Sequence, residues 1–197
     1  MSPDPYIPST ATPGWRAMAD IVAETERLIL RTVDEGDEAE HARLLNSPTI
    51  MKFIGGPMEP GEIEQWHAKA MAMYAREGFS FLFVIEKASG EMVGYCGIKR
   101  VDDPAAPNLG DHEIGWKIRE DRWSRGYASE AMRAVIDWAF TRVGVPHVVA
   151  ITDPDNTASW KLMEKLGMVR RDDLDFEADH GPLIQYSLTA DQWESAA

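Results

Sequence analysis

Apolar and polar residues recur along the chain with two distinct periods, and each period predicts one kind of element. Strict alternation, or a short unbroken apolar run, predicts a β-strand. Seven segments show one of these patterns, at residues 27–31, 79–85, 92–101, 112–118, 148–151, 168–176 and 183–188. The turn at residues 88–90 predicts that the second and third segments pair as a hairpin.

A period of three to four residues predicts helices, and it is clearest after residue 127. There the apolar side chains define one face, at Ala128, Ala131, Met132, Val135, Ile136, Ala139 and Phe140. Gly144 and Pro146 are expected to end this helix. The other helices are predicted at residues 34–46, 61–76 and 156–167, with Asp34 and either Asp155 or Asn156 as N-caps.

The order of these elements predicts an α/β fold, a mixed sheet with helices on its faces. The chain of 197 residues has the length of one domain. Residues 1–24 are rich in Pro, Ser and Thr and are predicted to form a flexible leader. Residues 25–197 are therefore expected to form one domain.

The net charge of the chain limits the classes of molecule that it is expected to bind. The formal net charge of -13 argues against a nucleic-acid surface, which needs a basic patch. The negative charge is compatible with a cationic amine substrate, which an acidic cleft attracts. It is equally compatible with a role in solubility alone. No apolar run is long enough to cross a membrane and no signal peptide is evident, so a cytoplasmic protein is expected.

Candidate nucleophiles and metal ligands are few. Cys96, the one cysteine, excludes an internal disulfide, and its apolar surroundings favour a buried small hydrophobe over a nucleophile. The histidines are scattered, and no Cys/His spacing predicts a metal site.

One segment carries a pattern with chemical meaning. The predicted strand at residues 112–118 leads through a turn containing Gly126 into the start of the most regular helix. A helix N-terminus offers unpaired N–H groups, and glycine allows an anion to approach the backbone closely. Ser124, Ser129 and Arg125 can add hydroxyl and charge contacts. Taken alone, the pattern also fits an ordinary strand-to-helix turn.

Five segments in the right order make the pattern more specific. They lie at residues 26–31, 94–98, 113–116, 123–131 and 156–168. Together they resemble the GNAT superfamily of acetyltransferases, most closely the RimJ/RimL group of ribosomal-protein N-terminal acetyltransferases and their small-molecule relatives. The resemblance implies a mostly antiparallel sheet of six or seven strands that is splayed between its fourth and fifth strands, with helices on both faces.

The resemblance also implies a co-substrate, acetyl-coenzyme A, in the splayed opening, and no metal. The backbone of the fourth strand would hold the pantetheine arm, the loop and helix start would hold the pyrophosphate, and Asn156 and Ser159 would contact the arm. The residues so implied are Trp116, Lys117, Ile118, Trp123, Ser124, Arg125, Gly126, Tyr127, Ala128, Ser129, Asn156 and Ser159.

The expected reaction is direct attack of a neutral amine on the thioester within a ternary complex. An amine needs a base near neutral pH, and Glu113 is favoured over His112, because successive strand residues point to opposite faces. A structural hydrogen bond is the alternative role for Glu113. Met163 stands where many members of the superfamily have a tyrosine acid, so water or the thiolate's own stability must suffice. Glu130 is expected to be structural.

Three functions stay open at this point. The acceptor is either a protein N-terminus or a small amine, and the chain is then an N-acetyltransferase. The alternative, which Met163 keeps open, is a non-catalytic module that binds or senses acyl-coenzyme A. Relatives in this group are often dimers, so a homodimer is an expectation from the resemblance.

Overall fold

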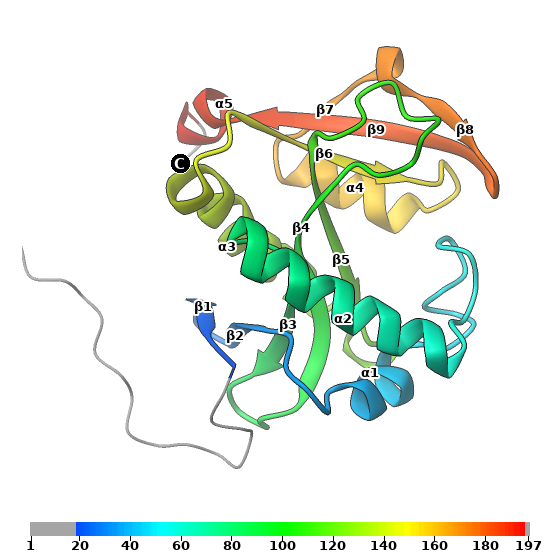
Figure 1. Cartoon of the computed structure of the whole chain (residues 1–197). Helices are drawn as coiled ribbons and strands as arrows, with labels where there is room; N and C mark the ends of the chain where they lie inside the picture. The colour runs from blue at the N-terminus through cyan, green and yellow to red at the C-terminus, as the bar shows by residue number, and fades with distance from the viewer. Residues whose placement is uncertain (1–18, 196–197) are drawn as a thin grey trace, which may run out of the picture.

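The computed structural model describes residues 19–195, which form one twisted sheet with helices on both faces (Figure 1). The strands of this part of the chain are β1 (Ile21–Glu24), β2 (Leu28–Thr32), β3 (Phe81–Glu86), β4 (Met92–Arg100), β5 (His112–Ile118), β6 (His147–Thr152), β7 (Val169–Arg170), β8 (Phe176–Ala178) and β9 (Gly181–Thr189). They run in the order β1-β2-β3-β4-β5-β6-β9-β7, and β8 pairs with β9. This confirms the predicted mixed α/β architecture.

The helices divide between the two faces of the sheet. They are α1 (Glu38–Leu45), α2 (Pro60–Glu77), α3 (Tyr127–Trp138), α4 (Thr157–Lys165) and α5 (Ala190–Ser195), with short helices η1 (Glu120–Arg122), η2 (Ala139–Val143) and η3 (Asp172–Leu174). The main core lies between the sheet, α3 and α4, and a second core lies beneath α1 and α2. Cys96 belongs to the main core and is fully buried, as predicted.

All neighbouring strands are antiparallel except β5 and β6. These two run parallel and share a single register pair, Glu113 with Val149. From Ile114 to Ile118, β5 is paired with β4 alone. The sheet therefore opens along one side of β5, which is the predicted splay between the fourth and fifth strands of the resemblance.

Three local predictions need correction. Residues 21–24, assigned to the leader, form β1, because Ala23 and its neighbours pair with β2; residues 1–18 lie outside the described residues. The first helix begins at Glu38 and not at Asp34, because the Asp37 carboxylate is held by Arg31 at 2.7 and 2.8 Å and fixes the turn there.

The third correction concerns residues 168–176, which were predicted as one strand. They form β7, η3 and the start of β8, because the polar residues between the strands bind one another. Arg171 bonds to Asp173, and Arg170 reaches over to Asp175. The sheet consequently has nine strands in the described residues, where the resemblance implied six or seven.

Close packing of β4 explains two of its glycines. A Cβ on Gly94 would lie 2.1 Å from the carbonyl oxygen of Lys117, and one on Gly97 would lie 2.3 Å from that of Ser80. Both neighbours are backbone atoms, so they cannot rotate away. Glycine is therefore required where β4 passes its neighbouring strands.

We predict that Gly97→Ala lowers the free energy of unfolding by about 3 kcal/mol, because the added methyl group forces backbone apart. Urea denaturation followed by circular dichroism would measure this. Gly61→Ala is the matched control, since nothing lies within 4 Å of its Cβ position in α2. Equal stability of the two variants would contradict the prediction.

Candidate cofactor and acceptor site

The predicted cofactor loop lies at the end of β5 where the sheet is open. η1 ends at Arg122, and residues 123–126 form an exposed turn that leads into α3. Gly126 is the N-cap with φ +81°, and Ser124 has φ +58°. Such angles favour glycine and are uncommon for serine, so the turn is held in a specific shape.

The N-terminus of α3 has no side-chain cap. Gly126 has no side chain to bond with the first N–H groups, and the first helical bond is that of Glu130 N to Gly126 O at 3.0 Å. Free N–H groups and the helix dipole thus point into the loop, an arrangement that suits an anion such as a pyrophosphate. Arg125, which is exposed and forms no ion pair within residues 19–195, adds a positive charge there.

An ionic clamp fixes this helix start to the rest of the sheet. The Glu130 carboxylate accepts bonds from Thr25 Oγ1 at 2.5 Å, Arg27 N at 2.9 Å and Arg27 Nε at 2.6 Å. Arg27 also donates to the carbonyl of Arg125 at 3.0 Å and stacks over Tyr127. Burial alone would raise the pKa of Glu130, but these hydrogen bonds outweigh it and lower the pKa. The expected structural role of Glu130 agrees with this geometry.

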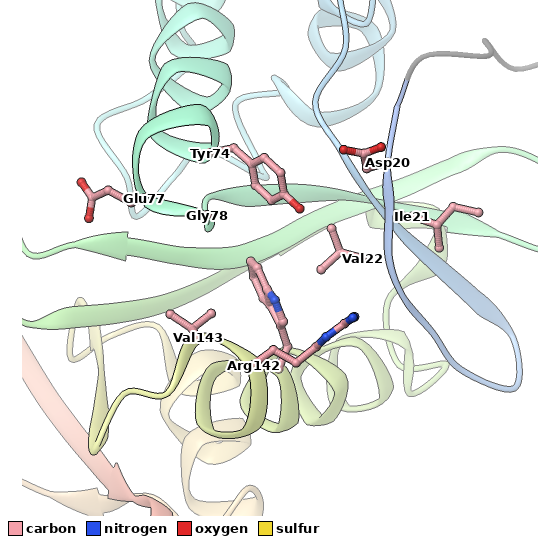
Figure 2. Close-up of a pocket in the computed structure, with 9 residues that line it drawn as sticks. Asp20, Ile21, Val22, Tyr74, Glu77, Gly78, Arg142 and Val143 are labelled. Atoms are coloured by element: carbon pink, nitrogen blue, oxygen red, sulfur yellow. The ribbon is translucent and has the colours of Figure 1, made fainter. Parts of the chain in front are cut away.

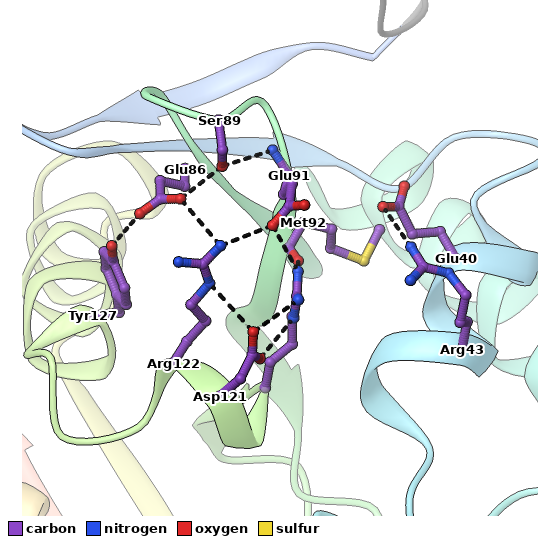
Figure 3. Close-up of polar contacts among 10 residues, drawn as sticks. Glu40, Arg43, Glu86, Ser89, Glu91, Met92, Asp121, Arg122 and Tyr127 are labelled. Carbon is purple, nitrogen blue, oxygen red and sulfur yellow. Dashed lines mark hydrogen bonds and ion pairs between the residues drawn. The ribbon is translucent and has the colours of Figure 1, made fainter.

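A second polar network holds the strand end that precedes the loop (Figure 3). Arg122 bonds to Glu91 at 2.8 Å and lies 3.5 Å from Glu86, which also accepts a bond from the hydroxyl of Tyr127. The side chain of Tyr127 therefore points away from the loop. Only its backbone N–H is available to a ligand. Arg119 bonds to Glu91 and Asp121 in the same network.

Trp123 anchors the loop to the end of β5. Its indole N–H donates to the carbonyl of Ile118 at 2.7 Å, and 47% of the residue is exposed. The bond ties the loop to the last residue of β5. One face of the ring is left open to solvent or to a ligand.

The helix on the other side of the opening is α4. The Asn156 side chain caps it by accepting from Ser159 N at 3.3 Å, which identifies the N-cap that the sequence left open between two residues. The amide nitrogen of Asn156 donates no hydrogen bond within the described chain. Met163 is buried in the main core and offers no proton.

The two candidate bases lie on opposite faces of β5, as strand geometry requires. Glu113 points to the α1–α2 face and pairs with Lys99 at 3.2 Å. Burial raises the pKa of Glu113 despite that cation. His112 points to the α3 face against Phe79, with ring centroids 5.3 Å apart, and burial lowers its pKa. These shifts make Glu113 a stronger base than an ordinary carboxylate and His112 a weaker base than an ordinary imidazole.

Lys117 has a charged side chain that is buried in the protein. The prediction concerned its backbone, yet its side chain is buried on the α1–α2 face, 2.7 Å from the Met51 sulfur and over the Tyr95 ring. Burial lowers the pKa of Lys117 to about 7. On the same face, His41 Nδ1 lies 3.0 Å from His67 Nε2, two residues that the sequence showed only as scattered histidines. Only the packing of α1 on α2 brings these two together.

A cavity lies elsewhere in the described part of the chain. It has a volume of about 450 Å³ and is lined by Asp20, Val22, Tyr74, Trp138 and Arg142, among others (Figure 2). Trp138 is the last residue of α3 and Arg142 lies on η2, which follows it, so both are far along the chain from the uncapped N-terminus of α3. This cavity is therefore separate from the predicted cofactor loop. Among residues 19–195, no group of three His, Cys, Asp or Glu side chains is placed to hold a metal, and no helix is long and apolar enough to span a bilayer.

The split in the sheet thus lies beside an uncapped helix start, an arrangement that suits an anionic ligand. The sequence pattern of the family described as acetyltransferase (GNAT) domain matches residues 27–169, and the chain belongs to this family. This confirms the resemblance drawn from the five segments.

Individual relatives agree with the family. YnaD of Bacillus subtilis (strain 168), named an uncharacterized N-acetyltransferase, is 36% identical over 149 residues, which cover 74% of this chain and 81% of YnaD. The structure of RimL, a ribosomal alpha-N-protein acetyltransferase, superposes with a TM-score of 0.73 at 16% identity, covering 90% of this chain and 98% of RimL. The structure of the aminoglycoside acetyltransferase AAC(6')-Ib in complex with coenzyme A superposes with a TM-score of 0.70 at 19% identity, covering 85% of this chain and 98% of AAC(6')-Ib.

We predict that Glu130→Gln lowers the free energy of unfolding by about 2 kcal/mol, because it removes charge-assisted bonds to Arg27. Thermal denaturation would measure the loss. The exposed Glu64→Gln in α2 is the control. The clamp would be disproved if both variants had the wild-type melting temperature.

The buried bases predict an unusual dependence of stability on pH. Burial, then Lys117 and His67, lower the pKa of His41 to about 3. Folded His41 and Lys117 thus lose protons that the unfolded chain keeps. Stability therefore rises with pH in the windows between their folded and unfolded pKa values, and is lost as pH falls through them.

For Lys117 this window runs from about 7 to the ordinary value of 10.5. Lys117→Met should therefore stabilise the protein more at about pH 6 than at about pH 9.5, by on the order of 2 kcal/mol. Urea titrations of both proteins at the two pH values would test this. If the difference in free energy of unfolding between the variant and the wild type were the same at both pH values, the lowered pKa of Lys117 would be wrong.

Proposed function

We propose that the protein transfers an acetyl group from acetyl-coenzyme A to a primary amine of a protein N-terminus or a small molecule. The observation that carries the proposal is the uncapped N-terminus of α3 at the open side of β5. The pyrophosphate binds the N–H groups of residues 125–128, and the pantetheine arm runs along the backbone of Trp116, Lys117 and Ile118. Ser124, Ser129, Asn156 and Ser159 add polar contacts, and Trp123 borders the arm.

In this proposal the amine enters from the α1–α2 face and attacks the thioester directly. Glu113 accepts its proton, and His112, on the other face, is the weaker candidate. A backbone N–H of β5 stabilises the oxyanion. Since Met163 gives no proton, the thiolate leaves with solvent as its proton source, and positioning of the two substrates supplies much of the rate.

Calorimetry with acetyl-coenzyme A tests the cofactor site. Gly126→Glu should weaken binding by about a hundredfold or more, because a carboxylate then meets the pyrophosphate at close range. Gly144→Glu is the matched control, since Gly144 also has a positive φ, of +77°, with open space around its Cβ position. Wild-type protein that does not bind would refute the proposal.

An acetylation screen with peptides and small amines tests the reaction. We predict that Glu113→Gln lowers kcat about a hundredfold with an accepted amine, while the affinity for acetyl-coenzyme A stays unchanged. A kcat equal to that of the wild type would show that Glu113 is not the base and that another group accepts the proton. Tight binding of acetyl-coenzyme A with no transfer to any amine would favour the sensing module, which the buried Met163 also supports.

A further inference from the structure

The cavity of Figure 2 lies away from the predicted cofactor loop, and the fold leaves several of its lining groups unused. Three parts of the chain meet there: the start of β1, the C-terminal end of α2, and the segment in which α3 passes into η2. Its volume of about 450 Å³ is far larger than one water needs and lies in the range of small-molecule sites.

Two side chains of opposite charge line this cavity and form no ion pair within residues 19–195. Asp20 is fixed by its backbone, because its N–H donates to Thr32 Oγ1 and its carbonyl accepts from Thr32 N, both at 2.9 Å. Its carboxylate and the guanidinium of Arg142 make no hydrogen bond in the described part of the chain. Figure 2 shows the two on opposite sides of Val22. Both charges are therefore available to a ligand.

The other acid of the described lining is already neutralised. Glu77 accepts bonds from Arg76 at 2.6 Å and from Arg100 at 2.9 Å, and these bonds lower its pKa. Figure 2 shows its carboxylate pointing away from Asp20 and Arg142. The cavity is left with one free negative and one free positive charge, which favours neither a simple cation nor a simple anion.

A buried indole N–H adds an unused donor. Trp138 is 6% exposed, yet its N–H donates no hydrogen bond to any described residue. Trp123, Trp160 and Trp193 are more exposed, and each donates to a protein acceptor. A buried indole N–H usually has a partner. Trp138 lines the cavity and its nitrogen is not sealed off by described protein atoms, so a ligand there can supply the acceptor.

Tyr74 completes the polar wall of the cavity. Figure 2 shows its hydroxyl reaching from α2 toward Asp20 and Val22, and it forms no hydrogen bond with the described residues. Burial raises the pKa of this phenol, Asp20 adds to the rise and Arg142 opposes it, so the hydroxyl keeps its proton at neutral pH. The side chains of Val22 and Val143 supply apolar surface in the same cavity.

We propose that this cavity binds a free α-amino acid with an apolar side chain, at a site separate from acetyl transfer. The ligand's carboxylate accepts bonds from Arg142 and from the indole N–H of Trp138, and its ammonium group donates to Asp20. Its side chain covers the apolar surface of Val22 and Val143. A zwitterion gives each free charge a partner of opposite sign, whereas a singly charged ligand would leave one of them desolvated and unpaired.

The position of the cavity makes it independent of the proposed cofactor site. Gly126 caps one end of α3 and Trp138 is the last residue at the other. A helix of this length spans about 18 Å at its ordinary rise per residue. The amino acid therefore does not reach the pyrophosphate, and both ligands can be bound together.

Calorimetry of the full-length protein with L-leucine, L-methionine and L-phenylalanine tests the site. At least one of the three should bind with a dissociation constant of about 1 mM or tighter, with or without coenzyme A present. The N-acetyl and methyl-ester forms of that amino acid should bind about tenfold more weakly or worse, because each has lost one charge. No binding of any of the three at about 10 mM, or equal binding of the blocked forms, would overturn the proposal.

Two variants place the ligand in the cavity. Asp20→Asn and Arg142→Gln should each weaken binding by about tenfold or more, and both positions are exposed, so the melting temperature should not fall. The matched controls are Asp179→Asn and Arg133→Gln, which are exposed and outside the cavity lining, and both should bind as the wild type does. Wild-type affinity in the two cavity variants would show that the amino acid binds elsewhere.

The indole N–H of Trp138 gives a direct signal of binding. Its nitrogen–proton NMR peak, assigned by its loss in Trp138→Phe, should shift as the amino acid is added. A peak that stays in place when the site is saturated would overturn the predicted contact and with it the site. The calorimetry of Asp20→Asn and Arg142→Gln decides the proposal if Trp138→Phe does not fold.

Gly126→Glu separates this site from the proposed function. The variant should lose affinity for acetyl-coenzyme A and keep the wild-type affinity for the amino acid. An amino acid that binds the wild type and not this variant occupies the acetyl-transfer site as an acceptor, and a separate site would be excluded. A wild-type protein that binds the amino acid and not acetyl-coenzyme A would refute the proposed function alone.

Discussion

The separation of β5 from β6 is the constraint on which the rest of the site depends. Each strand is held firmly on its other side: β5 has seven register pairs with β4, and β6 has six with β9. Only Glu113 and Val149 join the two halves of the sheet. Because sheet twist accumulates from strand to strand, two halves joined at one end diverge along the remainder. The single pair between β5 and β6 is enough to explain the opening, and no extra segment has to hold the two strands apart.

The helix start beside this opening has no side-chain cap. Most helices are capped by a side chain that uses up the first N–H groups. α3 has Gly126 at this position, so the donors stay free, and stability must come from elsewhere. The bonds of Glu130 to Thr25 and Arg27 supply it, and Arg27 also holds the loop through the carbonyl of Arg125. A negative charge in the first turn also suits the helix dipole.

The sequence was informative where one pattern controls the outcome. The α3 helix, the strand at residues 112–118 and the αL glycines that end helices were predictable, because apolar periodicity and glycine conformation are local properties. The single pair between β5 and β6, the Arg27–Glu130 clamp and the contact of His41 with His67 were not. Each joins residues far apart in the chain, and no local pattern encodes such a distance. The break at residues 171–175 was missed because ion pairs outweighed a weak strand pattern.

The two faces of β5 show how one strand serves both folding and chemistry. The side chains of Ile114 and Ile118 fill the main core under α3, and this face fixes the strand. The opposite face carries the half-buried Glu113 and the buried Lys117, two ionisable groups that are costly to desolvate. A chain selected for stability alone would place apolar residues on both faces of a strand this deeply covered. In the proposed reaction the amine approaches from this side, so the cost of these groups would be offset by the need for a proton acceptor at Glu113.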